Sequence, residues 1–287
     1  MKKLILLIAL LISPILAQCD WNEDSIIDIL DIVQTVDCVL SDCWSNVIYG
    51  CTDSDAQNYN SDANFDDGSC EYSCWDSDNN SYETVVIGDQ VWMAENLKAT
   101  YYSNGDPIPT GFANEEWGDL FDTGLGAFAI YPSDNDDVSQ NTCNGNCEEV
   151  YGNIYNWYAV YDWRGICPES YHIPSLAEWS TLKEYLTSDG FDENDGDALK
   201  ESGYTHWLYS TENVNGFDQY NYSGLPGGYR DGNDGHYEGM GENGFFWSSY
   251  ANSNYSSFYH FLDYEGSGFY WSSIIPSYGF SVRCIRD

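Results

Sequence analysis

The chain has 287 residues and a formal net charge of −38, because 47 acidic residues outnumber 9 basic ones. Such an acidic surface repels nucleic acid and anionic membranes, which excludes nucleic-acid binding, and it attracts divalent cations. Hydrophobic residues make up 43% of the chain and aromatic residues 17%, enough to bury a core, so global disorder is also excluded.

The first 17 residues have the pattern of a secretory signal peptide. Two lysines precede an apolar run over residues 4–16, and Ala17 supplies the small residue at the cleavage position. The run is too short for a spanning helix, so we expect no membrane insertion. A lipoprotein cleaved before Cys19 is the alternative. All ten cysteines follow this segment, which fits an oxidising compartment and predicts a secreted, extracellular or cell-surface protein.

Residues 18–48 contain one stretch with the spacing of an EF-hand calcium loop, followed by a stretch with helical spacing. It resembles one half of a dockerin repeat. Ser25 stands where Gly makes the sharp turn, and the lack of a second repeat argues against cohesin as a partner. We predict calcium as a structural cofactor here, with an acidic helix cap as the alternative. The predicted metal ligands are Asp20, Asn22, Asp24, Asp28 and Asp31.

Residues 49–74 form a module rich in Asn and Asp that resembles short Cys-bracketed modules of secreted proteins. Cys51 and Cys70 are the obvious pair and would close a loop of about twenty residues. Asp62, Asn64 and Asp66 again have calcium spacing, but a spacer stapled by one disulfide is the favoured role. Four further cysteines allow three pairings, among which the sequence does not choose: Cys19, Cys38, Cys43 and Cys74.

The main domain is predicted to span residues 75–287. Residues 82–87 and 90–93 are predicted as two strands joined by a tight turn. Residues 101–150 lack a sustained period and are predicted as long loops over a sheet, with Cys143 and Cys147 stapling a local turn. The aromatic run over residues 151–160 fits either a buried strand or a buried helix.

A helix is predicted after residue 175. Ser175 is a suitable N-cap, and Glu178 three positions later completes a capping box. Trp179, Leu182 and Leu186 then mark one apolar face. After residue 216 the chain is predicted to form short strands with Gly-rich turns.

Basic residues are scarce, which draws attention to two arginines near predicted strand ends. Arg230 and Arg283 are each predicted to pair with a carboxylate. Gly227 and Gly228 are predicted to provide a positive φ or a close backbone approach. All four residues are interpreted as scaffold.

Several motifs occur in order along the main domain. They include Gln90-x-Trp92-Met93, Tyr155-Asn156-Trp157, Cys167-Pro168, His172-Ile173-Pro174-Ser175, Leu225-Pro226-Gly227-Gly228-Tyr229-Arg230, Trp247-Ser248-Ser249 and Gly279-Phe280-Ser281-Val282-Arg283-Cys284. From about residue 76 to the end, the chain therefore resembles the Fibrobacter succinogenes major paralogous domain family.

That family is similar to the C-type-lectin-like fold, including its formylglycine-generating-enzyme variant. The resemblance implies an α+β domain with short twisted antiparallel strands, one or two helices and long loops, preceded by a small disulfide-stapled stalk. It further implies that the first and last strands of the domain pair and that Cys167 bridges to Cys284. It supplies a fold, whereas function has to be argued from a site.

Catalytic and metal-binding motifs find little support. The four histidines lie in no metal-binding pattern, and no nucleophile elbow occurs, so we predict no enzyme activity. A carboxylate pair for glycoside hydrolysis is the alternative, because acidic residues are so numerous. The motifs of calcium-dependent sugar binding are missing, although the acidic loops 192–197 and 231–234 are candidates for calcium as well as for solvated turns.

Residues 250–278 are rich in Tyr, Ser and Asn, a composition that recognition surfaces favour. These residues alternate with small or apolar ones, as strands would present them. We predict a non-catalytic binding module that recognises an extracellular glycan or protein through this face, with a structural matrix component as the alternative. The predicted ligand-binding residues are Asn252, Asn254, Tyr255, Tyr259, His260, Tyr264, Tyr270 and Trp271.

Overall fold

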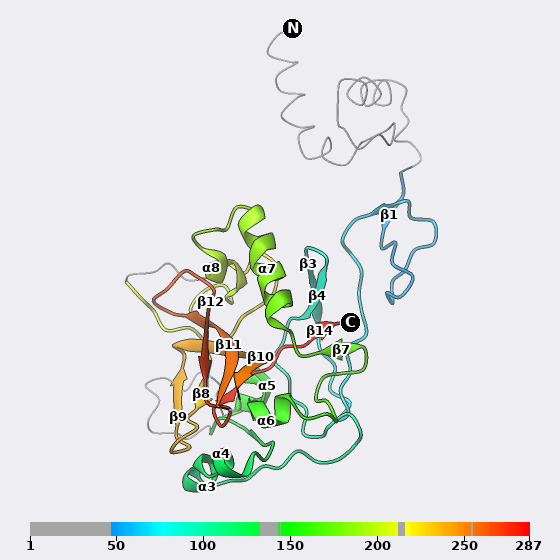
Figure 1. Cartoon of the computed structure of the whole chain (residues 1–287). Helices are drawn as coiled ribbons and strands as arrows, with labels where there is room; N and C mark the ends of the chain where they lie inside the picture. The colour runs from blue at the N-terminus through cyan, green and yellow to red at the C-terminus, as the bar shows by residue number, and fades with distance from the viewer. Residues whose placement is uncertain (1–46, 133–142, 144, 212–215, 254) are drawn as a thin grey trace. The chain divides into compact units, whose positions relative to one another are not determined.

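A computed structural model describes residues 47–132, 143, 145–211, 216–253 and 255–287 (Figure 1). The chain divides into two compact units, one ending at Cys70 and the other comprising Glu71–Asp287, so the division falls four residues before the predicted one. The predicted signal peptide, the calcium loop at residues 20–31 and Asn254 lie outside the described residues, as do Cys19, Cys38 and Cys43.

The described part of the first unit is a small loop-rich module. The short strands β1 (Tyr49–Gly50) and β2 (Phe65–Asp66) pair in parallel. The rings of Tyr49 and Phe65 meet edge to face at 5.1 Å. The predicted Cys51–Cys70 disulfide is present and closes the module.

Two of the three residues with calcium spacing in this module hold its loops by hydrogen bonds. Asn64 Oδ1 accepts from the backbone amide of Ile48 at 3.0 Å. Asp66 accepts from the Gly68 amide at 2.8 Å and from the Thr52 hydroxyl at 2.9 Å. These bonds, that from Gly68 foremost, hold the pKa of Asp66 below its usual range. The favoured role as a stapled spacer fits this arrangement.

The second unit is built on two sheets. The larger has strand order β12-β11-β10-β8-β13-β6-β5, with β9 also paired to β8, and the smaller has order β3-β4-β14-β7. The strands of the larger sheet are β5 (Phe128–Ala129), β6 (Ile154–Asn156), β8 (Gly227–Arg230), β9 (Tyr237–Met240), β10 (Asn243–Ser253), β11 (Ser256–Asp263), β12 (Tyr270–Ile274) and β13 (Gly279–Phe280).

The smaller sheet joins the two ends of the unit. Its strands are β3 (Thr84–Ile87), β4 (Gln90–Met93), β7 (Tyr171–His172) and β14 (Ile285–Arg286). The predicted hairpin is confirmed as β3 and β4, with Gly88 at a φ of 62° in its turn. Ile285 of β14 pairs with Trp92, so the last strand lies beside the first hairpin. The Cys167–Cys284 disulfide, which the resemblance implied, fastens this edge.

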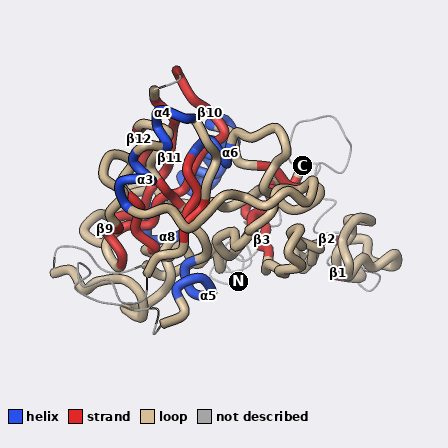
Figure 2. Tube along the Cα trace, turned by 90° about the horizontal axis from the view of Figure 1, so that it is seen from below, coloured by secondary structure: helices blue, strands red, loops and turns tan. Residues whose placement is uncertain are grey.

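The helices are short except for one. They are α3 (Asn114–Gly118), α4 (Leu120–Thr123), α5 (Cys147–Tyr151), α6 (Trp157–Val160), α7 (Leu176–Ser188) and α8 (Asp195–Leu199). Figure 2 shows the remainder as loops around the strands. The described parts of residues 101–150 are mostly loop, as predicted, but they contain α3, α4, β5 and most of α5, and the predicted Cys143–Cys147 disulfide is present. No described helix has the length and hydropathy to span a bilayer.

Helix α7 confirms the capping-box prediction. The Ser175 hydroxyl accepts from the Glu178 amide, and Glu178 in turn accepts from the Ser175 amide. The predicted face of Trp179, Leu182 and Leu186 is fully buried. The aromatic run 151–160, by contrast, divides between the two alternatives, with β6 followed directly by α6, because the Asn156 side chain accepts from the Ala159 amide and caps a new helix.

The prediction that both arginines pair with carboxylates is wrong. Arg230 donates to the carbonyls of Gly235 at 2.9 Å and Phe112 at 2.7 Å. Arg283, which is fully buried, donates to Asn96 Oδ1 at 2.8 Å and to the carbonyl of Ser223.

Aromatic rings complete both sites. The guanidinium of Arg230 lies 4.3 Å from the centre of the Trp117 ring, and that of Arg283 lies 4.2 Å from the centre of the Tyr222 ring. Within the described residues, oriented carbonyls and π faces replace the expected carboxylates.

Candidate functional site

The predicted recognition face divides into two parts. The covered part lies under helix α7 and includes Phe246 and His260, whereas the bare part has no described helix over it and includes Phe258 and Trp271. Phe246 on β10, His260 on β11 and Trp271 on β12 occupy neighbouring register positions and share one face of the sheet. Helix α7 packs over β10 and β11 on this face, where the Trp179 ring stacks on His260 at 4.8 Å.

The prediction that His260 contacts a ligand is wrong. Its side chain is only 7% exposed and is enclosed by the rings of Trp179 and Phe269. Burial, with a smaller contribution from the positive charge of Lys183, lowers the pKa of His260 to about 3. The imidazole is therefore a neutral part of the core.

Two of the predicted tyrosines are only partly accessible. The ring of Tyr259 packs at 4.8 Å from Phe280 and edge-on to Trp247 on the opposite face of the sheet. The hydroxyl of Tyr264 donates to Glu265 at 2.9 Å in the turn after β11. Tyr259 thus belongs mainly to the core, and Tyr264 to a turn.

The bare part of the face carries an aromatic ladder formed by Tyr250, Phe258 and Trp271. The ring centres of Tyr250 and Phe258 are 5.6 Å apart, and those of Phe258 and Trp271 are 5.7 Å apart. Trp271 is 63% exposed and Tyr250 is half-exposed. Asn252, Tyr255 and Tyr270 from the predicted set are also exposed. The strands therefore present rigid aromatic surface to solvent.

A cleft of about 530 Å³, which we call the small cleft, lies beside Tyr250 of the ladder. Its walls come from the α6 region and from the end of β10, and every described residue that lines it is uncharged. They are Trp157, Tyr158, Tyr161, Ser249, Tyr250, Ala251, Asn252, Ser253 and Pro276.

Tyr161 is the most exposed aromatic residue of this cleft. It is 68% exposed, and its ring stacks on Trp157 at 4.6 Å with only 12° between the ring planes. Trp157 is itself fixed, because its indole donates to the Ser248 carbonyl at 3.0 Å. Beyond Tyr161, the guanidinium of Arg164 binds both carboxylate oxygens of Asp162. The Tyr161 ring is therefore an exposed surface on a rigid support.

The large cleft, of about 760 Å³, adjoins the small cleft through Tyr161 and Ser249, which line both. Its lining also includes the exposed ring of Trp75 and three ionisable side chains, those of Asp76, Glu169 and His172. The large cleft therefore differs from the small one in having ionisable walls.

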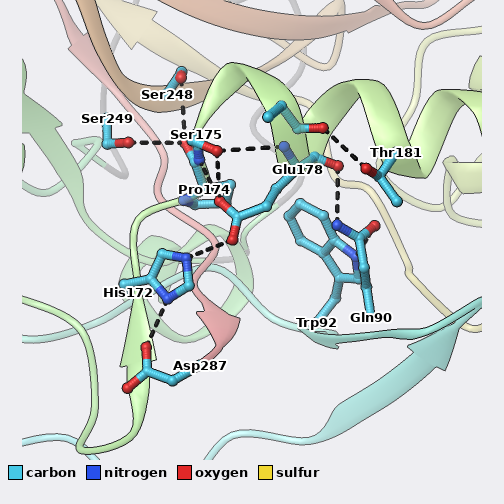
Figure 3. Close-up of polar contacts among 11 residues, drawn as sticks. Gln90, Trp92, His172, Pro174, Ser175, Glu178, Thr181, Ser248, Ser249 and Asp287 are labelled. Atoms are coloured by element: carbon cyan, nitrogen blue, oxygen red, sulfur yellow. Dashed lines mark hydrogen bonds and ion pairs between the residues drawn. The ribbon is translucent and has the colours of Figure 1, made fainter.

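His172, which lines the large cleft, is held between two carboxylates (Figure 3). Its Nε2 lies 2.7 Å from Glu178 Oε1, and its Nδ1 lies 2.7 Å from Asp287 Oδ1. Burial alone lowers the pKa of His172, but the hydrogen bonds to Asp287 and Glu178 outweigh it and raise the pKa above its ordinary value. Burial raises the pKa of Glu178, yet the bonds from Ser175 and His172 hold it below the usual range.

The same network joins the start of α7 to β10 (Figure 3). The carbonyl of Pro174 accepts from the Ser249 amide at 2.9 Å and from the Ser248 hydroxyl at 3.2 Å. On the other side, the side-chain amide of Gln90 donates to the Glu178 carbonyl at 3.0 Å. These contacts fix where α7 begins relative to the sheet, and so where the bare part of the face starts.

In the acidic loop 192–197, a candidate for calcium, two of the carboxylates pair with lysine side chains. Asp195, which is buried, pairs with Lys183 Nζ at 2.6 Å, and Asp197 pairs with Lys200 Nζ at 3.0 Å. The other candidate loop is a turn in which Asp231 accepts from backbone amides and from the Tyr278 hydroxyl. Across the described ranges, no three His, Cys, Asp or Glu side chains gather where they could hold a metal ion.

A family model described as the Fibrobacter succinogenes major domain matches residues 85–286. The chain belongs to this family. No curated protein and no solved structure matched the chain. The Fibrobacter succinogenes major domain of this chain thus includes nearly all of both sheets of the second unit, the aromatic ladder and almost all of the two clefts.

Four aromatic residues of the ladder and the clefts are absent from the predicted set of ligand-binding residues, namely Trp75, Tyr161, Tyr250 and Phe258. One signal in the sequence indicated that Tyr161 could be exposed, because it follows the aromatic run 151–160 and directly precedes the polar Asp162. That Tyr161 and Tyr250 line the same cleft depends on the packing of α6 beside the end of β10, which no local pattern predicts.

Proposed function

We propose that this chain is a secreted or surface-displayed binding module that recognises an extracellular glycan or protein without catalysing a reaction. The observation that carries the proposal is the exposed aromatic ladder of Tyr250, Phe258 and Trp271 on regular strands. Exposed aromatic rings on a rigid framework give large contact areas at small entropic loss, which is characteristic of recognition surfaces. The predicted signal peptide and the three disulfides found among the described residues support an extracellular location.

We further propose that the α+β domain has the C-type-lectin-like fold. The pairing of β14 with the β3–β4 hairpin and the Cys167–Cys284 disulfide support this assignment. In this proposal the strands β10–β12 supply the recognition surface, and the smaller sheet closes the domain.

The arrangement of His172 supports the non-catalytic part of the proposal. Both nitrogens of the imidazole already contact carboxylates, and the hydrogen bonds to Asp287 and Glu178 outweigh burial and raise its pKa. A general base needs a free lone pair within reach of the substrate. His172 is therefore better suited to fixing the start of α7 than to proton transfer.

The test is a binding assay of the full chain on a glycan array and on bacterial cell surfaces. Trp271→Ala is expected to lower binding about tenfold or more, since it removes the most exposed ring of the ladder. Tyr209→Ala is the control, because Tyr209 is similarly exposed but lines neither cleft. Equal losses in both variants, or no binding by the wild type, would overturn the proposal. Release of hydrolysis products from a bound glycan would favour an enzyme instead.

A further inference from the structure

We infer that the small cleft is a subsite for a neutral sugar residue of a glycan, with Tyr161 as the stacking surface. The inference rests on the proposed function and specifies its ligand. Three observations lead to it: the described lining of the cleft is uncharged, it combines aromatic rings with small polar groups, and its exposed ring has a rigid support.

The first observation is the absence of charge from the described lining of the small cleft, in a chain whose net charge is −38. Acidic side chains are so frequent that an uncharged cleft stands out from the rest of the surface. The overall negative potential disfavours anionic ligands such as uronic-acid polymers, while the cleft offers no carboxylate to bind a cation. A neutral ligand is the class that meets both conditions.

The second observation is that the cleft combines aromatic surface with small polar groups. Tyr161 and Tyr250 contribute exposed rings, and Asn252, Ser249 and Ser253 contribute amide and hydroxyl groups. A sugar has an apolar C–H face and a rim of hydroxyls. The rings suit the face and the polar groups suit the rim, because a few polar groups in a largely aromatic site fix the orientation of a ligand.

The support beneath Tyr161 makes it suitable for stacking. Trp157 lies parallel to it on the core side, so the ring keeps its orientation before a ligand arrives. A ring that is already ordered loses little conformational freedom on binding. The outer face of Tyr161 is left as the accessible surface, and it adjoins the large cleft, in which the chain of the glycan would continue toward Trp75.

The experiment measures binding of the full chain to cellohexaose, xylohexaose, mannohexaose and chitohexaose by calorimetry, with an oligogalacturonide as the anionic comparison. We expect at least one neutral oligosaccharide to bind with an affinity that is independent of salt. Tyr161→Ala is expected to weaken this binding about tenfold or more, and Tyr161→Phe to retain it. Tyr209→Ala, with 69% exposure against 68% for Tyr161, is the matched control. Near-UV circular dichroism checks that each variant is folded.

The outcomes separate this inference from the proposed function. If cell-surface binding occurs but no neutral oligosaccharide binds, the sugar assignment is overturned while the recognition function stands. If a neutral oligosaccharide binds and Tyr161→Ala binds equally well, the location in the small cleft is overturned. A tighter complex with the oligogalacturonide would overturn the neutral ligand class. Absence of binding in every assay would overturn the proposed function as well.

Discussion

The same three strands, β10–β12, carry both a buried core and an exposed aromatic ladder. In the covered part, Phe246 and His260 lie beneath Trp179 of α7. In the bare part, Phe258 and Trp271 continue the same face without a helix over them. The side chains of the two parts are alike in type. The difference lies in the partner element, because burial of a strand face depends on what packs against it.

An aromatic strand pattern therefore indicates that the strand can pack against another element, and does not show whether its face is exposed. α7 begins where the Pro174 carbonyl meets Ser248 and Ser249, and the strand positions beyond that point are left uncovered. A buried aromatic residue and one exposed to solvent are therefore only a few positions apart along β10.

The largest expected effect comes from the centre of the covered part. Trp179→Ala removes a fully buried ring that contacts Trp92, Phe246 and Phe269, and should lower the free energy of unfolding by about 3–5 kcal/mol. Trp271→Ala in the bare part should change it by less than about 0.5 kcal/mol. Urea unfolding with the disulfides intact measures both. Similar losses in the two variants would contradict the division of the face.

A second effect comes from the ion pair that ties the β11–β12 connection to α7 and α8. Asp195 accepts from the Phe269 amide at 2.7 Å and pairs with Lys183, and its side chain is buried. Asp195→Ala leaves an amide without its acceptor, and should lower the free energy of unfolding by about 2–3 kcal/mol.

Asp192→Ala is the control for this experiment, because Asp192 belongs to the same acidic loop but is exposed. It should stay within about 0.5 kcal/mol of the wild type. Equal losses of unfolding free energy in Asp195→Ala and Asp192→Ala would mean that the loop acts only through its charge. The buried ion pair would then not stabilise the covered part.

Local signals in the sequence predicted the local parts of this fold. The capping box of Ser175 and Glu178 lies within four residues, so it located α7, and the turn at Gly88 located the first hairpin. The partners of Arg230 and Arg283 were predicted wrongly. Pairing by charge considers only carboxylates, whereas the actual partners are carbonyls and rings that distant segments bring close.

The sequence predicted which strands carry the exposed aromatic residues, but not which of those residues a helix covers. Alternation along β11 separates Phe258 and His260 from Tyr259, but it does not show which face α7 covers. Exposure of Tyr255, Tyr270 and Trp271 agrees with the predicted face, whereas His260 does not. Tyr161 and Tyr250 come to line one cleft only through tertiary packing, so the sequence alone did not predict the clefts.

The smallest expected effect lies at the boundary between the two parts, where His172 meets Glu178. The raised pKa of His172 means that its contribution is fully present below the unfolded value of about 6.5 and is lost as the pH rises through the folded value. The lowered pKa of Glu178 means that its contribution is present above the unfolded value of about 4.3 and is lost as the pH falls through the folded value. Their mutual support should therefore be greatest between about pH 4.3 and 6.5.

A double-mutant cycle of His172→Gln and Glu178→Gln measures this support directly. At pH 5.5 the coupling energy should be below about 1 kcal/mol, because the His172 side chain is 40% exposed and solvent screens the pair. At pH 9 it should approach zero, since the imidazole has lost its charge. A coupling energy that is equal at both pH values would show that the pair acts as a neutral hydrogen bond. The boundary between the covered and bare parts would then be held by the Pro174 contacts rather than by charge.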